Sequence, residues 1–295
     1  MRLTYPLPSL LTLVLSPFTL QSCAQVSPPP SLDIDSVQAY ERLAAQYEDH
    51  IHSLGTEDES DEILIGNTQL REHTLPAVIS SFIPRFRLLA AAHPHTQGAG
   101  RALSWIALHA WESKDLKDAV DPLIAEYVDQ SYMTTVCWAL SLKPTAYASD
   151  ALDRIVKQAT SPRTELWALY CQSRHNLMIA DLLMYLREPT PAPNPPGDWR
   201  ASFPRETLAW LDTLNATTLE NDAVKSLERV IASADDVQVD NRCVADVARA
   251  ALFEVQHLRI GQVAPEIQGE DVNGVRFTLS QYRGKIVVLD FWGHW

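Results

Sequence analysis

Apolar positions recur with the period of an α-helix over most of the chain. In residues 241–258 the apolar side chains are spaced by three or four positions, so that they share one helical face. They are Val244, Val247, Ala248, Ala251, Leu252, Val255 and Leu258. Similar stripes occur in residues 35–54, 100–112, 117–131, 145–160, 163–188 and 219–233. The pattern predicts a mainly α-helical domain over residues 34–258.

The joints between these segments are short, and they are polar or contain proline. Residues 93–98, 142–145 and 159–163 are of this kind. Helices that are joined so closely pack as antiparallel hairpins, which favours a helical bundle or a short helical array. No fixed period runs through the segments, so no named repeat family is indicated.

Three further features subdivide the helical part. An acidic stretch at 55–62 and a proline-rich stretch at 188–203 are typical of solvated loops. Pro84 follows the serines at 80 and 81. We expect a helix to break at these serines and to begin again at Pro84, because proline fits best in the first turn.

After Leu258 the pattern changes to short runs that are typical of strands. Asn273 and Gly274 form the pair that most often makes a tight hairpin turn. The run from Lys285 to Trp292 is apolar apart from its first residue and Asp290, which is the pattern of a central strand covered on both faces. The sequence therefore predicts a second domain that begins at residue 259.

The first 23 residues have the composition of an export signal rather than of a membrane span. Arg2 precedes an apolar run that is broken by prolines, and small residues follow. The ending LQSC resembles the lipobox of bacterial lipoproteins, which implies that Cys23 is acylated; ordinary cleavage after Ala24 is the alternative. The proline-rich residues 24–33 are typical of a tether. We expect an exported protein, anchored through Cys23 on the periplasmic side of a bacterial membrane.

Composition and charge exclude several classes of function. Apolar residues make up 46% and charged residues 21%, as in ordinary globular proteins, and the formal net charge is −13. So acidic a surface repels phosphate backbones, and nucleic acid is therefore not an expected partner. The sequence contains no glycine-rich phosphate loop and no GxSxG nucleophile turn.

The cysteines and histidines offer only weak candidates for chemistry. Beyond Cys23 there are three cysteines, an odd number that permits at most one internal pair, and their helical positions favour small buried apolar side chains. They are Cys137, Cys171 and Cys243. His50 and His52 fall on different helical faces and His93 and His95 lie in a loop, so neither pair has chelating geometry. We expect no metal site and no cofactor.

Four pieces after residue 259 carry a specific resemblance. They are GQVAPEI at 261–267, DVNG at 271–274, FTLSQYRGK at 277–285 and VVLDFWGHW at 287–295. In this order they resemble the opening of a thioredoxin-like redoxin domain, the type shared by membrane thiol-disulfide oxidoreductases and the alkyl hydroperoxide reductase/thiol-specific antioxidant group. The resemblance implies the first strands of an α/β domain, followed directly by a Cys-x-x-Cys motif. It also implies protein dithiols, disulfides or peroxide as partners.

The resemblance assigns roles to individual residues. Asp290 stands where thioredoxins carry a proton-handling acid, six positions before the first cysteine, and Trp292 and Trp295 match the aromatic flank of the active-site turn. His294 stands beside that turn, where it would lower the thiol pKa; a plain surface position is the alternative. The nucleophile itself would follow Trp295. A thiol there lies at the amino terminus of a helix, where the helix dipole stabilises the thiolate.

Three explanations for the missing nucleophile stay open. The sequence is a fragment, its gene carries a nonsense change, or a UGA codon after Trp295 encodes selenocysteine. As printed, we expect the apolar run to present an unpaired strand edge and to promote aggregation. The alternative function is a non-enzymatic helical binding or scaffold lipoprotein with a decayed redox domain.

The helical part carries a second, weaker resemblance. Residues 85–94 and 246–261 are similar to the amino-terminal portion that accompanies such redoxin domains in exported bacterial proteins, planctomycete ones especially. This resemblance implies no activity.

Overall fold

The fold is mainly α-helical, as the hydrophobic pattern predicts. A computed structural model describes residues 33–55, 63–110, 113–187, 203–233, 236–259 and 261–290. The helices of these ranges are α1 (Ile34–Gly55), α2 (Ile63–Ala92), α3 (Gln97–His109), α4 (Ser113–Glu126), α5 (Met133–Ser141), α6 (Ala146–Gln158), α7 (Pro162–Arg187), α8 (Arg205–Asp212), α9 (Ala216–Ser233) and α10 (Val244–His257).

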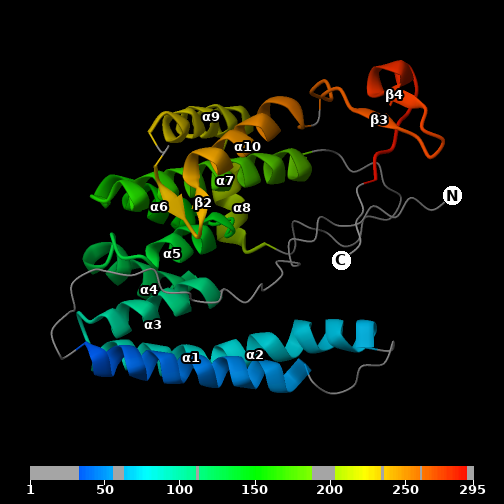
Figure 1. The fold of residues 1–295 in the computed structure, drawn as a ribbon. Coiled ribbons are helices and arrows are strands. Elements are labelled where there is room, and N and C mark those ends of the chain that lie inside the picture. Colours follow the sequence, from blue (N-terminus) through cyan, green and yellow to red (C-terminus); the bar gives the residue numbers. More distant parts are fainter. Residues whose placement is uncertain are drawn as a thin grey trace.

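The helices form a layered stack rather than a closed ring. Figure 1 shows the long pair α1 and α2 at one end of the stack and the pair α9 and α10 at the other. Between them α3 packs on α2 and α4, and α7 packs on α5, α6 and α9. Most contacts therefore join helices that are near in sequence, as expected for a short helical array.

The course of α2 corrects the expected break before Pro84. The helix continues from Ile63 to Ala92 with Pro76 and Pro84 inside it. An interior proline costs about 3 kcal/mol. Burial of Ile83 and Phe86 on either side of Pro84 offsets that cost, since each large apolar side chain contributes about 1.5 to 3 kcal/mol. Packing against α3 thus overrides the local preference.

Part of α2 has the length and composition of a membrane span. Among the described residues this holds for Leu75–Ala92 only. Within that stretch the side chains of Phe82, Ile83 and Phe86 are buried in the protein core, and the guanidinium of Arg87 pairs with the carboxylate of Asp115. One face of α2 therefore packs into the core of the stack.

The hydrophobic pattern did not predict the two short strands that precede α10. Strand β1 (Gln238–Val239) pairs antiparallel with β2 (Arg242–Cys243) just before α10. The turn between them holds Asp240 and Asn241 at φ values of 49° and 61°. Two successive left-handed residues are typical of a type I′ hairpin turn, which Asp and Asn tolerate better than most residues.

The helical part ends at an ion-paired arginine. Arg259 follows α10, and its guanidinium pairs with the carboxylate of Asp181 on α7 and, at 3.3 Å, with that of Glu220 on α9. Beyond it, residues 261–290 contribute no side chain to either buried hydrophobic cluster. They contain strands β3 (Gln268–Glu270) and β4 (Arg276–Thr278) and the 3₁₀ helix η2 (Leu279–Tyr282).

Candidate functional site

The pieces that resemble a redoxin fold into one small unit. Strands β3 and β4 pair antiparallel, with Gln268 opposite Thr278 and Glu270 opposite Arg276. The expected hairpin at Asn273 and Gly274 is therefore present. It appears in Figure 1 beyond the end of α10.

The hairpin turn is built by an aspartate and a glycine. The Asp271 Oδ1 atom accepts hydrogen bonds from the backbone N–H of Asn273 at 2.8 Å and of Val275 at 2.9 Å. These hydrogen bonds lower the pKa of the Asp271 carboxyl. Gly274 has a φ of 77°, which favours glycine because a side chain would be strained there. The DVNG piece thus fixes the register of both strands.

The first and third pieces meet beside η2. The backbone N–H of Ser280 donates to Glu266 Oε1 at 2.9 Å, and that of Leu279 donates to the carbonyl of Ile267 at 2.9 Å. Thr278 and Gln281 form a reciprocal cap at the start of η2. Segments separated by the hairpin are therefore held together by hydrogen bonds at its base.

The expected central strand is not formed in the described part of the last piece. Residues 285–290 have no strand structure, and Ile286 and Val288 are 99% and 87% exposed. A central strand needs neighbours on both edges, and no described strand lies beside this run. The prediction of a covered strand is therefore wrong for residues 285–290.

The candidate redox residues lie in or beyond this exposed run. Asp290 is exposed, whereas a residue of a central strand covered on both faces would be buried. Trp292, His294 and Trp295 lie outside the described residues, as does the lipidation candidate Cys23. The roles that the resemblance implies for these residues stay predictions.

Most residues of the predicted signal, tether and loops also lie outside the described ranges. The proposed signal and tether at 1–33 lie outside the described ranges except for Asp33, and so do residues 56–62 of the acidic loop and 188–202 of the proline-rich loop. Asp33 itself accepts a hydrogen bond from the backbone N–H of Gln97 at 2.8 Å. It therefore connects the start of α1 to the start of α3.

The cysteines of the helical part occupy two kinds of environment. Cys137 on α5 and Cys171 on α7 are fully buried free thiols, and Cys243 is half-buried at the end of β2. Burial raises the pKa of the Cys137 thiol to about 12 and raises that of Cys171 as well. Neither buried thiol forms a thiolate at neutral pH in the folded protein.

Histidines of the described ranges contact rings and carboxylates. Within the described ranges no three side chains of His, Cys, Asp or Glu lie close enough together to hold a metal ion. His50 contacts the ring of Phe82, with ring centroids 6.4 Å apart. The His95 Nδ1 atom lies 2.7 Å from Glu126 Oε2.

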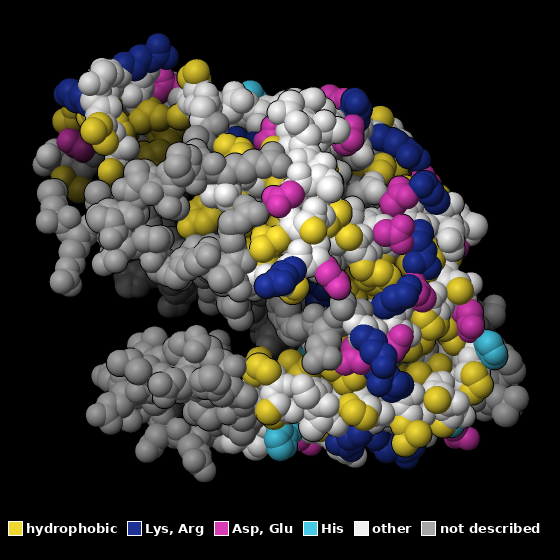
Figure 2. All heavy atoms as spheres, turned by 180° about the vertical axis from the view of Figure 1, so that it is seen from behind, with side chains coloured by type: hydrophobic (Ala, Val, Ile, Leu, Met, Phe, Trp, Pro, Cys, Tyr) yellow, Lys and Arg dark blue, Asp and Glu magenta, His cyan; other side chains and the backbone are white. Residues whose placement is uncertain are grey.

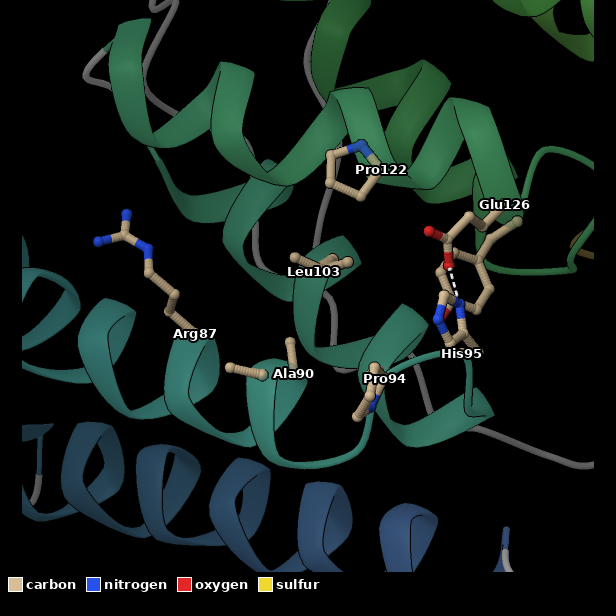
Figure 3. Close-up of a pocket in the computed structure, with 10 residues that line it drawn as sticks. Arg87, Ala90, Pro94, His95, Leu103, Pro122 and Glu126 are labelled. Carbon is tan, nitrogen blue, oxygen red and sulfur yellow. Dashed lines mark hydrogen bonds and ion pairs between the residues drawn. The ribbon is translucent and has the colours of Figure 1, made fainter.

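An apolar hollow of about 250 Å³ lies between α2 and α4, beside α3. Figure 3 shows Ala90, Pro94, Leu103 and Pro122 converging on it. The His95–Glu126 pair stands at its rim. The side chains of His95 and Glu126 are 77% and 41% exposed, so their contact stabilises the fold by less than about 1 kcal/mol. The hollow offers apolar contact and carries no activated nucleophile.

Surface charge is mixed on the face seen in Figure 2. Basic and acidic side chains alternate there instead of gathering in one patch. Pairs such as Lys117–Asp121 and Lys157–Asp153, four positions apart on α4 and α6, show how the helices intersperse the two signs. Such an arrangement favours solubility.

Comparisons with known proteins add no relative. A scan against family models, a search of curated proteins and a search of solved structures each found no match.

Two features of these sites were missed from the sequence. The hollow and the ion pairs around it join residues that are 28 to 31 positions apart, and no local pattern signals such contacts. The contact between α5 and α7, the helices that carry Cys137 and Cys171, was missed for the same reason, although the apolar stripe on α7 already placed Cys171 on a buried face.

Proposed function

We propose that this chain contains the opening of a thioredoxin-like redoxin domain and that the protein is an exported thiol-disulfide oxidoreductase or peroxide-reducing redoxin. Its substrates are protein dithiols, disulfides or a peroxide. The redox-active residue of this proposal follows Trp295, and Asp290 transfers protons to and from the second cysteine. Cys23 carries the lipid anchor, and residues 24–33 form the tether.

One observation carries the proposal. The first and third pieces of the resemblance are joined by hydrogen bonds from Ser280 to Glu266 and from Leu279 to Ile267 at the base of the β3–β4 hairpin, and the second piece forms the turn of that hairpin. The family resemblance rests on the order of these pieces, and their packing into one unit supports their interpretation as the start of a domain. The unit leads directly into the apolar run that contains Asp290.

The chemistry of the proposed site follows from its place in that domain. A thiol or selenol directly after Trp295 would lie at a strand-to-helix junction, where the unpaired N–H groups of the helix stabilise its anion. The anion attacks a disulfide or a peroxide, and a second cysteine, separated from the first by two residues, then resolves the product. A carboxylate at Asp290 accepts the proton of that second thiol.

The experiment uses the complete reading frame. We expect the purified product to reduce insulin disulfides or a peroxide, and replacement of the residue after Trp295 by alanine to abolish turnover. Asp290→Asn should slow turnover roughly 10-fold or more, because it removes a general base. Leu289→Thr, a neighbouring change that removes no acid, is the matched control. Equal turnover in the Asp290→Asn variant and the control would contradict the role of Asp290.

A helical binding or scaffold lipoprotein is the second candidate. Every buried hydrophobic side chain of the described ranges falls between Leu43 and Ala248, so the helical part has its own core. In this candidate function the apolar hollow beside His95 and Glu126 would be the binding surface. A folded product that has an intact active-site pair and is nevertheless inactive on both substrates would support the scaffold.

A further inference from the structure

Helices α5 and α7 run side by side with a defined register. The Trp167 Nε1–H donates to the carbonyl of Thr134 at 2.9 Å. Further along both helices, the guanidinium of Arg174 lies 4.6 Å from the ring centroid of Trp138. From the first contact to the second, the residue number increases on α5 and also on α7. The two helices therefore run parallel here.

Cys137 and Cys171 lie on the facing sides of these helices. On α5 the contacting residue Thr134 precedes Cys137 by three positions, and on α7 Trp167 precedes Cys171 by four. Positions three and four apart share a helical face. Each cysteine therefore lies about one turn beyond the Thr134–Trp167 hydrogen bond, at the same level of the two helices.

Both thiols are shielded from solvent. Both side chains are 0% exposed and belong to the same hydrophobic cluster. The Coulombic influence of Cys137 on the pKa of Cys171 is upward, as for two like charges that are close together. Cys243 lies in a different place, at the end of β2 before α10.

We propose that Cys137 and Cys171 form a disulfide that links α5 to α7 when the chain folds in an oxidising compartment. The location outside the cytoplasm rests on the function proposed above, whereas the pairing rests on the helix contacts alone. Of the three cysteines in the helical part, Cys243 stays outside the pair.

The reaction requires a disulfide oxidant and must precede closure of the core. The Cys137 thiolate attacks one sulfur of the oxidant, which releases one thiol and forms a mixed disulfide. The Cys171 thiol then loses its proton and attacks the Cys137 sulfur, which releases the second thiol. Two protein thiols are oxidised and one disulfide is reduced to two thiols. Once folded, the buried sulfurs are protected from reductants.

The test refolds the full chain from denaturant with a mixture of reduced and oxidised glutathione. Free thiols are then alkylated, and the protein is digested with trypsin. The proposal expects a disulfide between the peptides spanning residues 118–154 and 164–174, which contain Cys137 and Cys171. The same link should form in the Cys243→Ala control. Alkylation of both cysteines, or a link from either of them to Cys243 or Cys23, would overturn the proposal.

A second measurement does not depend on any variant. The wild-type chain is refolded once under oxidising conditions, which allow the disulfide to form, and once with its cysteines kept reduced. The thermal unfolding midpoints of the two forms are then compared. A cross-link that closes a loop of this length should raise the unfolding midpoint by roughly 5 to 15 °C. Equal midpoints of the linked and reduced forms would show that the bond strains the helix contact and would contradict a native link. Because neither readout involves insulin or peroxide, their outcome is separate from that of the redoxin proposal.

Discussion

Trp105 of α3 stacks on Phe86 of α2, with ring centroids 4.0 Å apart and ring planes inclined by 20°. Tyr47 of α1 approaches the same indole edge-on, at 5.0 Å and 83°. These three rings join the first three helices of the stack. Offset stacking and edge-to-face contacts are the favourable arrangements of aromatic rings, and each adds about 0.5 to 1.5 kcal/mol beyond the area buried.

Replacement of Phe86 by alanine should therefore lower the free energy of unfolding by about 3 to 5 kcal/mol. Leu88, two positions along α2, is 71% exposed, and Leu88→Ala should change stability by less than about 0.5 kcal/mol. Urea unfolding followed by circular dichroism measures both. Similar losses in the two variants would contradict the assignment of Phe86 to the core.

Gly98 tests the contact between α1 and α3. A Cβ at this position would lie 2.3 Å from the backbone oxygen of Ser36, which cannot move without shifting α1. Glycine to alanine within a helix ordinarily stabilises by roughly 0.5 to 1 kcal/mol. Here we expect Gly98→Ala to destabilise instead, by more than about 1 kcal/mol. Urea unfolding measures this change, and a free energy of unfolding that is higher in Gly98→Ala than in the wild type would contradict the close contact between α1 and α3.

His175 should make the protein sensitive to acid. Burial lowers the pKa of this imidazole from 6.5 to about 4, so that between these values the unfolded chain binds a proton and the folded chain does not. Stability therefore falls as pH drops through this window. Between pH 7 and pH 5 the loss should be about 2 kcal/mol greater in the wild type than in His175→Leu. If the free energy of unfolding fell equally with pH in the wild type and in His175→Leu, His175 would not be buried in its neutral form.

The hairpin should be energetically separate from the helices. Gly274→Val forces a β-branched residue into a φ of 77° and should disrupt the β3–β4 turn. Since residues 261–290 add nothing to the buried clusters, the thermal midpoint of the helical signal should stay within about 1 °C. Amide exchange of the hairpin reports its loss, and Val272→Thr at a fully exposed position is the control. A lower helical midpoint in Gly274→Val alone would reveal packing between the two parts.

The sequence predicts the long helices well because their apolar stripes are long. Helices α1, α6, α7, α9 and α10 fall within a few residues of the expected ranges. The break at Pro84 was wrong, since core packing by Ile83 and Phe86 outweighs the local cost of proline. The helix α5 was missed because nine residues carry too few apolar repeats.

The candidate site was predictable only where the signal is local. The Asn273–Gly274 pair indicates its own turn, so the β3–β4 hairpin followed from the sequence. The exposed run at 286–290 shows the opposite case. Its apolar composition favours a covered strand, but strand formation also needs neighbouring strands, which the run itself cannot supply.

The central claim is that a redox-active residue follows Trp295, and the codons after that position in the transcript test it most directly. The account predicts a cysteine codon there, or a TGA codon that is translated as selenocysteine, with a second cysteine codon after two further residues. Translation that continues into a sequence without cysteine or selenocysteine at this position would contradict the claim.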